Sequence, residues 1–116
     1  MYPFENLKAW KESVILVEII YKESAKFPKD ERFSLVDQLK RAATSVSLNI
    51  AEGSGGRSKK AFAAGLEIAL KSLYETVSIL KMAQILFKVN FSKSLEQCDL
   101  VVKLIKGLIK SLESGI

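Results

Sequence analysis

Residues 41–62 read RAATSVSLNIAEGSGGRSKKAF, and this stretch decides the fold. It contains the end of one helical pattern, a glycine-rich turn and the basic beginning of a second helical pattern. On both sides of the turn, apolar residues recur at spacings of three and four, which is the periodicity of one face of an α-helix. The stretch therefore predicts two helices joined by a short turn.

The same spacing continues through the chain and predicts helices over residues 7–26, 34–53, 59–88 and 93–114 of one domain, residues 1–116. Two prolines and six glycines are too few for a turn-rich β protein, which indicates an all-α fold. The side chains expected in the core are Leu7, Trp10, Val14, Val17 and Tyr21; Val36, Leu39, Ala43, Val46 and Ile50; Phe62, Leu66, Ala69, Leu73, Leu80, Ala83 and Phe87; and Leu95, Cys98, Val102, Ile105, Ile109 and Leu112.

The predicted helix ends carry residues that are typical of helix caps. Asn6, Ser34 and Ser58 are the expected N-caps of the first three helices, and either Ser92 or Ser94 is expected to cap the fourth. Gly53 follows the second helical pattern, where a left-handed residue often ends a helix. Gly65 lies inside the third helix and costs up to about 1 kcal/mol relative to alanine, which close contact with another helix could offset.

Several apolar side chains lie outside the predicted core faces. Ile15 and Ile19 project nearly opposite the core face of the first helix, and Leu100 and Leu104 point away from that of the fourth. A monomer can tolerate such surface, but we favour an interface between subunits. Arg41, Leu48 and Glu52 share the outer face of the second helix and complete the candidate oligomer interface. Glu52 is unfavourable at a helix C-terminus and is expected to pair with Arg41 or Arg57 of the same or a neighbouring chain.

The turn itself is a candidate site for an anion or a nucleic-acid phosphate, formed by Arg57, Ser58, Lys59 and Lys60. Cations in a first helical turn oppose the helix dipole, and free backbone amides at this position attract anions. The stretch is not a P-loop, because Ser58 precedes Lys59 where that motif has glycine, and Lys60 follows where it has a hydroxyl residue. The alternative is a flexible hairpin turn with solvated lysines.

Composition restricts the possible functions. Residues 1–52 carry eight basic and eight acidic side chains, whereas residues 53–116 carry ten and five, so the net charge of +5 lies in the second half. The chain has no histidine, which excludes Ser-His and Cys-His pairs and the Glu-x-x-His ligands of di-iron bundles. We expect no enzymatic activity, no metal and no cofactor. A single cysteine, Cys98, and the absence of a signal or membrane-spanning segment predict a cytoplasmic protein.

The chain resembles the bacterial four-helix-bundle proteins encoded by intervening sequences within large-subunit ribosomal RNA genes. The residues that carry the resemblance are F-E-N-L-K-A-W at 4–10, F-P at 27–28, the segment from Arg41 to Gly53, and R-S-K-K-A-F at 57–62. This chain has Ser47 where that family often has proline, and Ala61 where it often has an acidic residue.

The resemblance implies an antiparallel up-down four-helix bundle that assembles into a homo-oligomeric ring, typically a pentamer. Accessory proteins of diversity-generating retroelements are similar in form, and they bind nucleic acid and a reverse transcriptase through a basic surface. The leading hypothesis is therefore non-specific binding of RNA or DNA. The main alternative is a protein–protein scaffold or adaptor that binds no nucleic acid.

Overall fold

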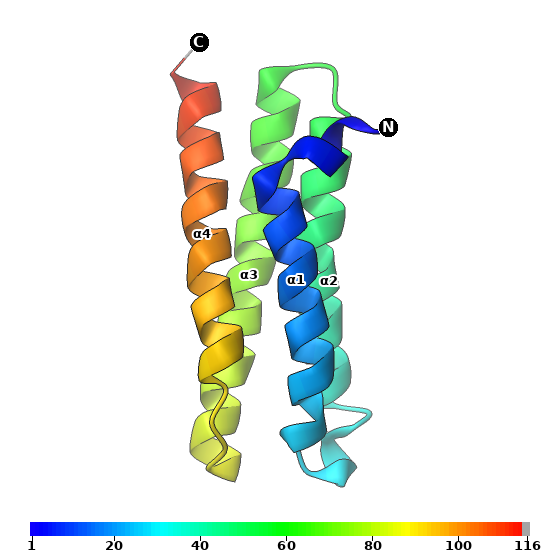
Figure 1. Ribbon diagram of the computed structural model, residues 1–116, viewed down its shortest axis with the longest axis vertical. Coiled ribbons are helices and arrows are strands. Elements are labelled where there is room, and N and C mark those ends of the chain that lie inside the picture. Colours follow the sequence, from blue (N-terminus) through cyan, green and yellow to red (C-terminus); the bar gives the residue numbers. More distant parts are fainter. Residues whose placement is uncertain (115–116) are drawn as a thin grey trace.

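The computed structural model describes residues 1–114, which are largely helical (Figure 1). The long helices are α1 (Lys8–Glu23), α2 (Leu35–Ser54), α3 (Lys59–Phe87) and α4 (Ser92–Glu113). Short 3-10 helices precede and follow α1: η1 (Pro3–Asn6), η2 (Ser24–Lys26) and η3 (Lys29–Glu31). Residues 1–114 contain no β-strand. The all-α fold class is confirmed, and each predicted helix coincides with one of the long helices.

The four long helices form an antiparallel up-down bundle. α1 packs against α2 and α4, and α3 packs against the same two helices. Figure 1 shows the chain direction alternating from each helix to the next. The α2–α3 turn therefore lies at the same end of the bundle as the start of α1 and the end of α4, in a body of 46 × 23 × 19 Å.

The predicted core faces of α2 and α3 are confirmed. All five α2 residues are buried, and Leu66, Ala69, Leu73, Leu80 and Ala83 of α3 are fully buried. Phe62 and Phe87 pack against this core while remaining partly exposed. Thr76, the polar residue within the α3 face, is fully buried, and its hydroxyl donates to the Ser72 carbonyl at 2.9 Å.

The predicted core face of α1 is confirmed in part, because Leu7, Trp10 and Val17 pack against the core while partly exposed. The buried residues are Ala9, Ser13, Leu16 and Ile20, whereas Val14 is 40% exposed and Tyr21 is 49% exposed. The reason is a polar contact that periodicity does not detect. The Ser13 hydroxyl donates to the Trp10 carbonyl at 2.6 Å and lies 2.9 Å from the Ser47 hydroxyl of α2. Ser13 can therefore face the core, and the larger apolar residues flank it.

The core face of α4 is confirmed in part. Cys98, Ile105 and Ile109 are buried, and so is Val101, which the sequence pattern did not single out. Leu95, Val102 and Leu112 pack on the core while partly exposed. The prediction that Leu104 points away from the core is wrong, because this side chain is partly buried and packs against the core; Leu100 is half-buried.

Two of the predicted N-caps are corrected, and Ser34 is confirmed as the N-cap residue of α2 by position but not by its side-chain bond. Asn6 belongs to η1, and Leu7 is the N-cap of α1. Ser34 precedes α2, but its hydroxyl donates to Glu31 rather than accepting from the helix. Phe91 precedes α4, while Ser94 lies inside it and gives both its amide and its hydroxyl to Glu23 of α1, at 3.1 and 2.5 Å. The carboxylate of Glu23 thus caps α4 across the bundle.

Candidate nucleic-acid interface

Two glycines hold the helices on either side of the α2–α3 turn in close contact. A Cβ built on Gly65 would lie 2.8 Å from the Gly53 Cα and 3.1 Å from the Asn49 carbonyl oxygen. A Cβ on Gly53 would lie 3.2 Å from the Gly65 Cα. The backbones of α2 and α3 therefore touch just before the turn. This confirms the expectation that a close helix contact accounts for Gly65.

The predicted role of Gly53 as a left-handed residue after the helix is wrong. α2 continues through Gly53 to Ser54, and Gly55 ends it with right-handed geometry, φ −85°. The last turn closes through hydrogen bonds from the Gly55 amide to the Glu52 carbonyl at 3.2 Å and from the Gly56 amide to the Gly53 carbonyl at 3.0 Å. Close packing rather than turn formation accounts for a glycine at this position, because Gly53 is helical and is buried against α3.

Ser58 caps α3 as predicted, because its hydroxyl accepts from the Ala61 amide at 3.0 Å. Arg57, Lys59 and Lys60 lie on either side of this cap and are all exposed. The first turn of α3 contains no acidic residue. The structure therefore places the four candidate residues together in solvent, at the positive end of a 29-residue helix.

The candidate interface residues of α2 lie on its outer surface. Leu48 is 59% exposed, and Glu52 and Arg41 are exposed as well. Arg41 forms an ion pair with Asp37, with 3.2 Å between its Nε and the Asp37 Oδ2. Neither Arg41 nor Arg57 pairs with Glu52 within residues 1–114. A partner of Glu52 in a neighbouring chain stays a prediction.

The other candidate interface residues lie on two separate parts of the surface. Ile15 is 41% exposed and Ile19 is half-buried. The Gln97 side-chain amide donates to the carbonyl and carboxylate oxygens of Glu12, both at 2.9 Å. These two hydrogen bonds show that Gln97 of α4 and Glu12 of α1 lie at the same height along the bundle axis. The two helices are antiparallel. Ile15 and Ile19 therefore lie between this bridge and the α1–α2 connection, whereas Leu100 and Leu104 lie between the bridge and the end of the bundle that carries the α2–α3 turn.

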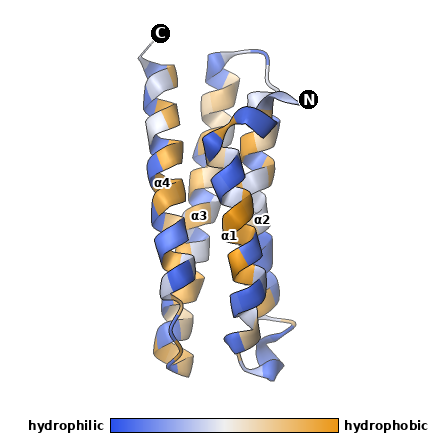
Figure 2. Ribbon diagram, in the orientation of Figure 1, coloured by the Kyte–Doolittle hydropathy of each residue, from blue (hydrophilic) through white to orange (hydrophobic). Residues whose placement is uncertain are grey.

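An apolar groove runs between α1 and α2. Val14, Val17 and Leu48 line it together with Thr44 and Ser47, and its volume is about 340 Å³. Figure 2 shows the apolar stretch of α1 in the middle of this helix. The groove includes Leu48, which the sequence pattern singled out, and Val14, which that pattern assigned to the core.

Sequence reasoning missed further exposed apolar side chains on α3. Ile68, Met82, Ile85 and Leu86 are between 45% and 76% exposed. They could have been found by listing the apolar residues of 59–88 that do not belong to the predicted core face. α3 therefore also carries apolar surface that the single chain does not cover.

The described residues hold few groups suited to chemistry. Burial, with a smaller contribution from the charge of Asp99, raises the pKa of the Cys98 thiol to about 12, so this side chain stays a packed thiol. Residues 1–114 contain no cluster of three or more His, Cys, Asp or Glu side chains placed to hold a metal ion. No helix within that range combines the length and apolarity needed to cross a membrane.

Comparison with known protein families gives a match over most of the chain. The family model described as "23S rRNA-intervening sequence protein" matches residues 5–110, which include all of α1, α2 and α3 and most of α4. A search of curated proteins finds no match to the chain.

Proposed function

The chain belongs to the family of 23S rRNA-intervening sequence proteins, and we propose that it is a non-enzymatic, homo-oligomeric protein of the cytoplasm that binds RNA or DNA non-specifically. The binding surface is formed by Arg57, Ser58, Lys59 and Lys60, with exposed lysines of α3 and α4 around it. The observation that carries this proposal is the exposed basic run at the N-terminus of α3, whose first turn contains no acidic residue.

The electrostatics of this turn favour an anionic ligand. Each cation in the first turn of a helix is unfavourable by a few tenths of a kcal/mol up to about 1 kcal/mol. A phosphate near the turn would be attracted both by these cations and by the positive end of the helix dipole, so it would offset the repulsion between them. It could also accept hydrogen bonds from the backbone amides of the α3 N-terminus. The Ser58 hydroxyl already accepts a hydrogen bond from the Ala61 amide. The turn would therefore keep its conformation on binding, and the basic side chains would make the main contacts with the phosphate.

Self-association is the second part of the proposal. Leu48 lines the groove between α1 and α2, and neither Ile15 nor Ile19 belongs to the lining of that groove. We therefore treat Leu48 and the two isoleucines as two different apolar patches. Two different patches are what a head-to-tail interface requires, and such an interface closes into a ring when the rotation between subunits allows it. We therefore favour a ring over a two-fold dimer, and the resemblance to the family implies a pentamer as its size.

Salt-dependent binding tests the nucleic-acid surface. Fluorescence anisotropy with labelled single-stranded RNA and DNA, at several salt concentrations, would compare the wild type with R57A/K59A/K60A. Each lost phosphate contact reduces the slope of log K against log salt by about 0.7 for single strands, so the triple variant should lose roughly 2 from this slope. K8A/K11A/K22A, which removes equal charge from exposed positions of α1, is the matched control. Unchanged binding by the turn variant would reject this surface.

Light scattering tests the assembly. We expect a defined oligomer for the wild type, smaller species for L48E, and no change for S92E, which adds the same charge at an exposed polar position at the beginning of α4. A monomeric wild type would reject the ring. A defined oligomer that binds no nucleic acid even at low salt would instead favour the alternative function, a protein–protein scaffold or adaptor. In that case the apolar groove between α1 and α2 would serve assembly alone.

A further inference from the structure

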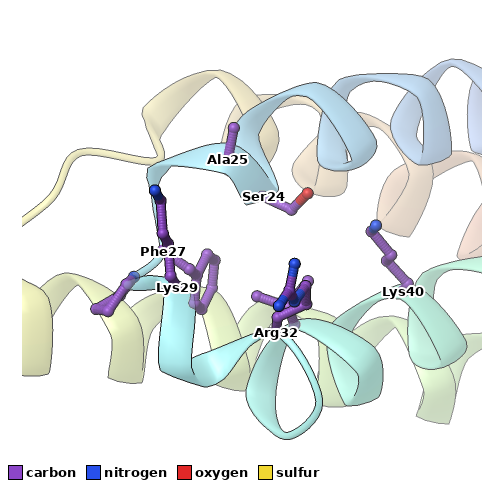
Figure 3. Close-up of a pocket in the computed structure, with 8 residues that line it drawn as sticks. Ser24, Ala25, Phe27, Lys29, Arg32 and Lys40 are labelled. Carbon is purple, nitrogen blue, oxygen red and sulfur yellow. The ribbon is translucent and has the colours of Figure 1, made fainter.

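A second cavity lies at the opposite end of the bundle from the α2–α3 turn, between the α1–α2 connection and the beginning of α2. Its volume is about 210 Å³. The buried side chains of Phe27 and Val36 line it, and three basic residues, Lys29, Arg32 and Lys40, surround it. Figure 3 shows the polar ends of Ser24, Arg32 and Lys40 around the same open space.

The charged side chains that line this cavity all have one sign. Its lining contains three cations and no carboxylate. Other basic residues nearby are neutralised, because Lys26 pairs with Glu23 at 2.8 Å and Arg41 pairs with Asp37 at 3.2 Å. By contrast, Lys29, Arg32 and Lys40 form no ion pair with any carboxylate of residues 1–114.

Aromatic rings support two of the three cations. The Lys40 ammonium lies 4.5 Å from the centroid of the Tyr21 ring, and Lys40 is half-buried. The Arg32 guanidinium lies 4.9 Å from the centroid of the Phe33 ring. Such contacts stabilise a cation without neutralising its charge. Both groups can therefore still donate hydrogen bonds to an anion.

The beginning of α2 adds to the positive potential. Val36, in the first turn of this 20-residue helix, lines the cavity, and no side chain caps the helix. Two carboxylates nearby have other contacts. Glu31 accepts from the Ser34 hydroxyl at 2.8 Å, and Asp37 pairs with Arg41. The positive end of the helix dipole therefore faces the same region as the three basic side chains.

We propose that this cavity binds a terminal phosphate group, that is, the dianion of a phosphate monoester or of inorganic phosphate. An arginine can hold such a group through two parallel hydrogen bonds, and lysines add point charges. The volume is below the range of roughly 300–1,000 Å³ that is typical of sites for whole organic ligands. The cavity therefore suits one phosphate group, with the remainder of the molecule outside it.

The test is a titration of the ¹⁵N-labelled full chain with inorganic phosphate at constant ionic strength, followed by NMR. We expect saturable shifts of the Arg32 and Val36 amide signals. In R32Q/K40Q the affinity should fall by at least about tenfold, since hydrogen bonds to charged groups are among the strongest. K22Q/K93Q removes equal charge from exposed lysines outside the cavity and should leave the affinity unchanged. Amide spectra of each variant without phosphate report whether it is folded.

A second arm identifies the source of the phosphate. Two RNA oligonucleotides of one sequence, one with a 5′-phosphate and one with a 5′-hydroxyl, are titrated into R57A/K59A/K60A, so that binding at the turn does not interfere. Cavity shifts with the 5′-phosphate alone would assign a nucleic-acid end; shifts with inorganic phosphate but neither RNA would assign a small molecule. Absence of saturable shifts with inorganic phosphate, or an equal loss of affinity in K22Q/K93Q, would overturn the proposal.

Discussion

Replacing Gly65 with alanine should destabilise the bundle, although alanine favours a helix. The new Cβ would lie 2.8 Å from the Gly53 Cα and 3.1 Å from the Asn49 carbonyl oxygen. Carbon atoms prefer separations of about 3.5–4.0 Å, so α2 and α3 would have to move apart locally. Overpacking of this kind costs about 1–3 kcal/mol, and the upper end applies because both neighbours are backbone atoms. The gain in helix propensity of about 1 kcal/mol leaves a net loss of about 2 kcal/mol.

The other glycines provide a graded comparison. A Cβ on Gly53 would approach to 3.2 Å, so G53A should lose less than G65A. A Cβ on Gly107 would have no neighbour within 4 Å, so G107A should gain up to about 1 kcal/mol. Thermal unfolding followed by circular dichroism would measure the series, at one protein concentration because self-association adds stability. At about 4 °C per kcal/mol, Tm should fall by about 8 °C in G65A and rise by up to about 4 °C in G107A. A G65A variant as stable as the wild type would refute the close approach of α2 and α3.

Two further substitutions test contacts between distant parts of the chain. Burial alone would raise the pKa of Glu23, but hydrogen bonds from Lys26 and Ser94 and the charge of Lys26 lower it below 4.5. Glu23 therefore contributes stability above about pH 4.5 that is lost as the pH falls through its folded-state pKa. Urea unfolding at several pH values measures this effect: as the pH falls, the free energy of unfolding should decrease less in E23Q than in the wild type. E96Q, at an exposed position, is the control and should behave as the wild type. If E23Q and the wild type lost the same free energy on acidification, the cap would be contradicted. S13A should lose about 1–3 kcal/mol, because it removes the oxygen that lies 2.9 Å from the buried Ser47 hydroxyl. S13A/S47A should recover part of this loss, and an equally unstable double variant would contradict a direct bond.

Periodicity was sufficient where apolar side chains alone decide packing. In α2, the five residues at three- and four-residue spacing are all buried. In α1, the same reasoning selected a face that includes Val14 and Tyr21, which are 40% and 49% exposed. The competing face contains Ser13, whose hydrogen-bonding neighbour Ser47 is 34 residues away. A rule that counts apolar residues cannot recognise a buried serine whose partner lies on another helix.

The helix ends and the candidate sites also show that the sequence predicts local contacts but not contacts between distant residues. Ser58 was identified as a cap because its acceptor contact, to the Ala61 amide, is local. The cap of α4 was missed because Glu23 lies 71 residues before Ser94. Lys29, Arg32 and Lys40 belong to a connection and a helix, and only the fold brings them around one cavity. Exposed basic runs can therefore be found by local inspection, whereas sites assembled across connections cannot.

The two proposed binding surfaces can be tested independently because α2 separates them. Val36 lines the phosphate cavity near the first residue of α2, and the basic turn follows its last residue. Twenty helical residues span about 30 Å, well beyond the distance at which substitutions usually interact. Losses from R32Q/K40Q and from R57A/K59A/K60A should therefore add in the free energy of binding to a 5′-phosphorylated RNA that reaches both surfaces. Strong non-additivity would instead mean that one change had disturbed the α2 scaffold, and the Tm of the two variants would show which.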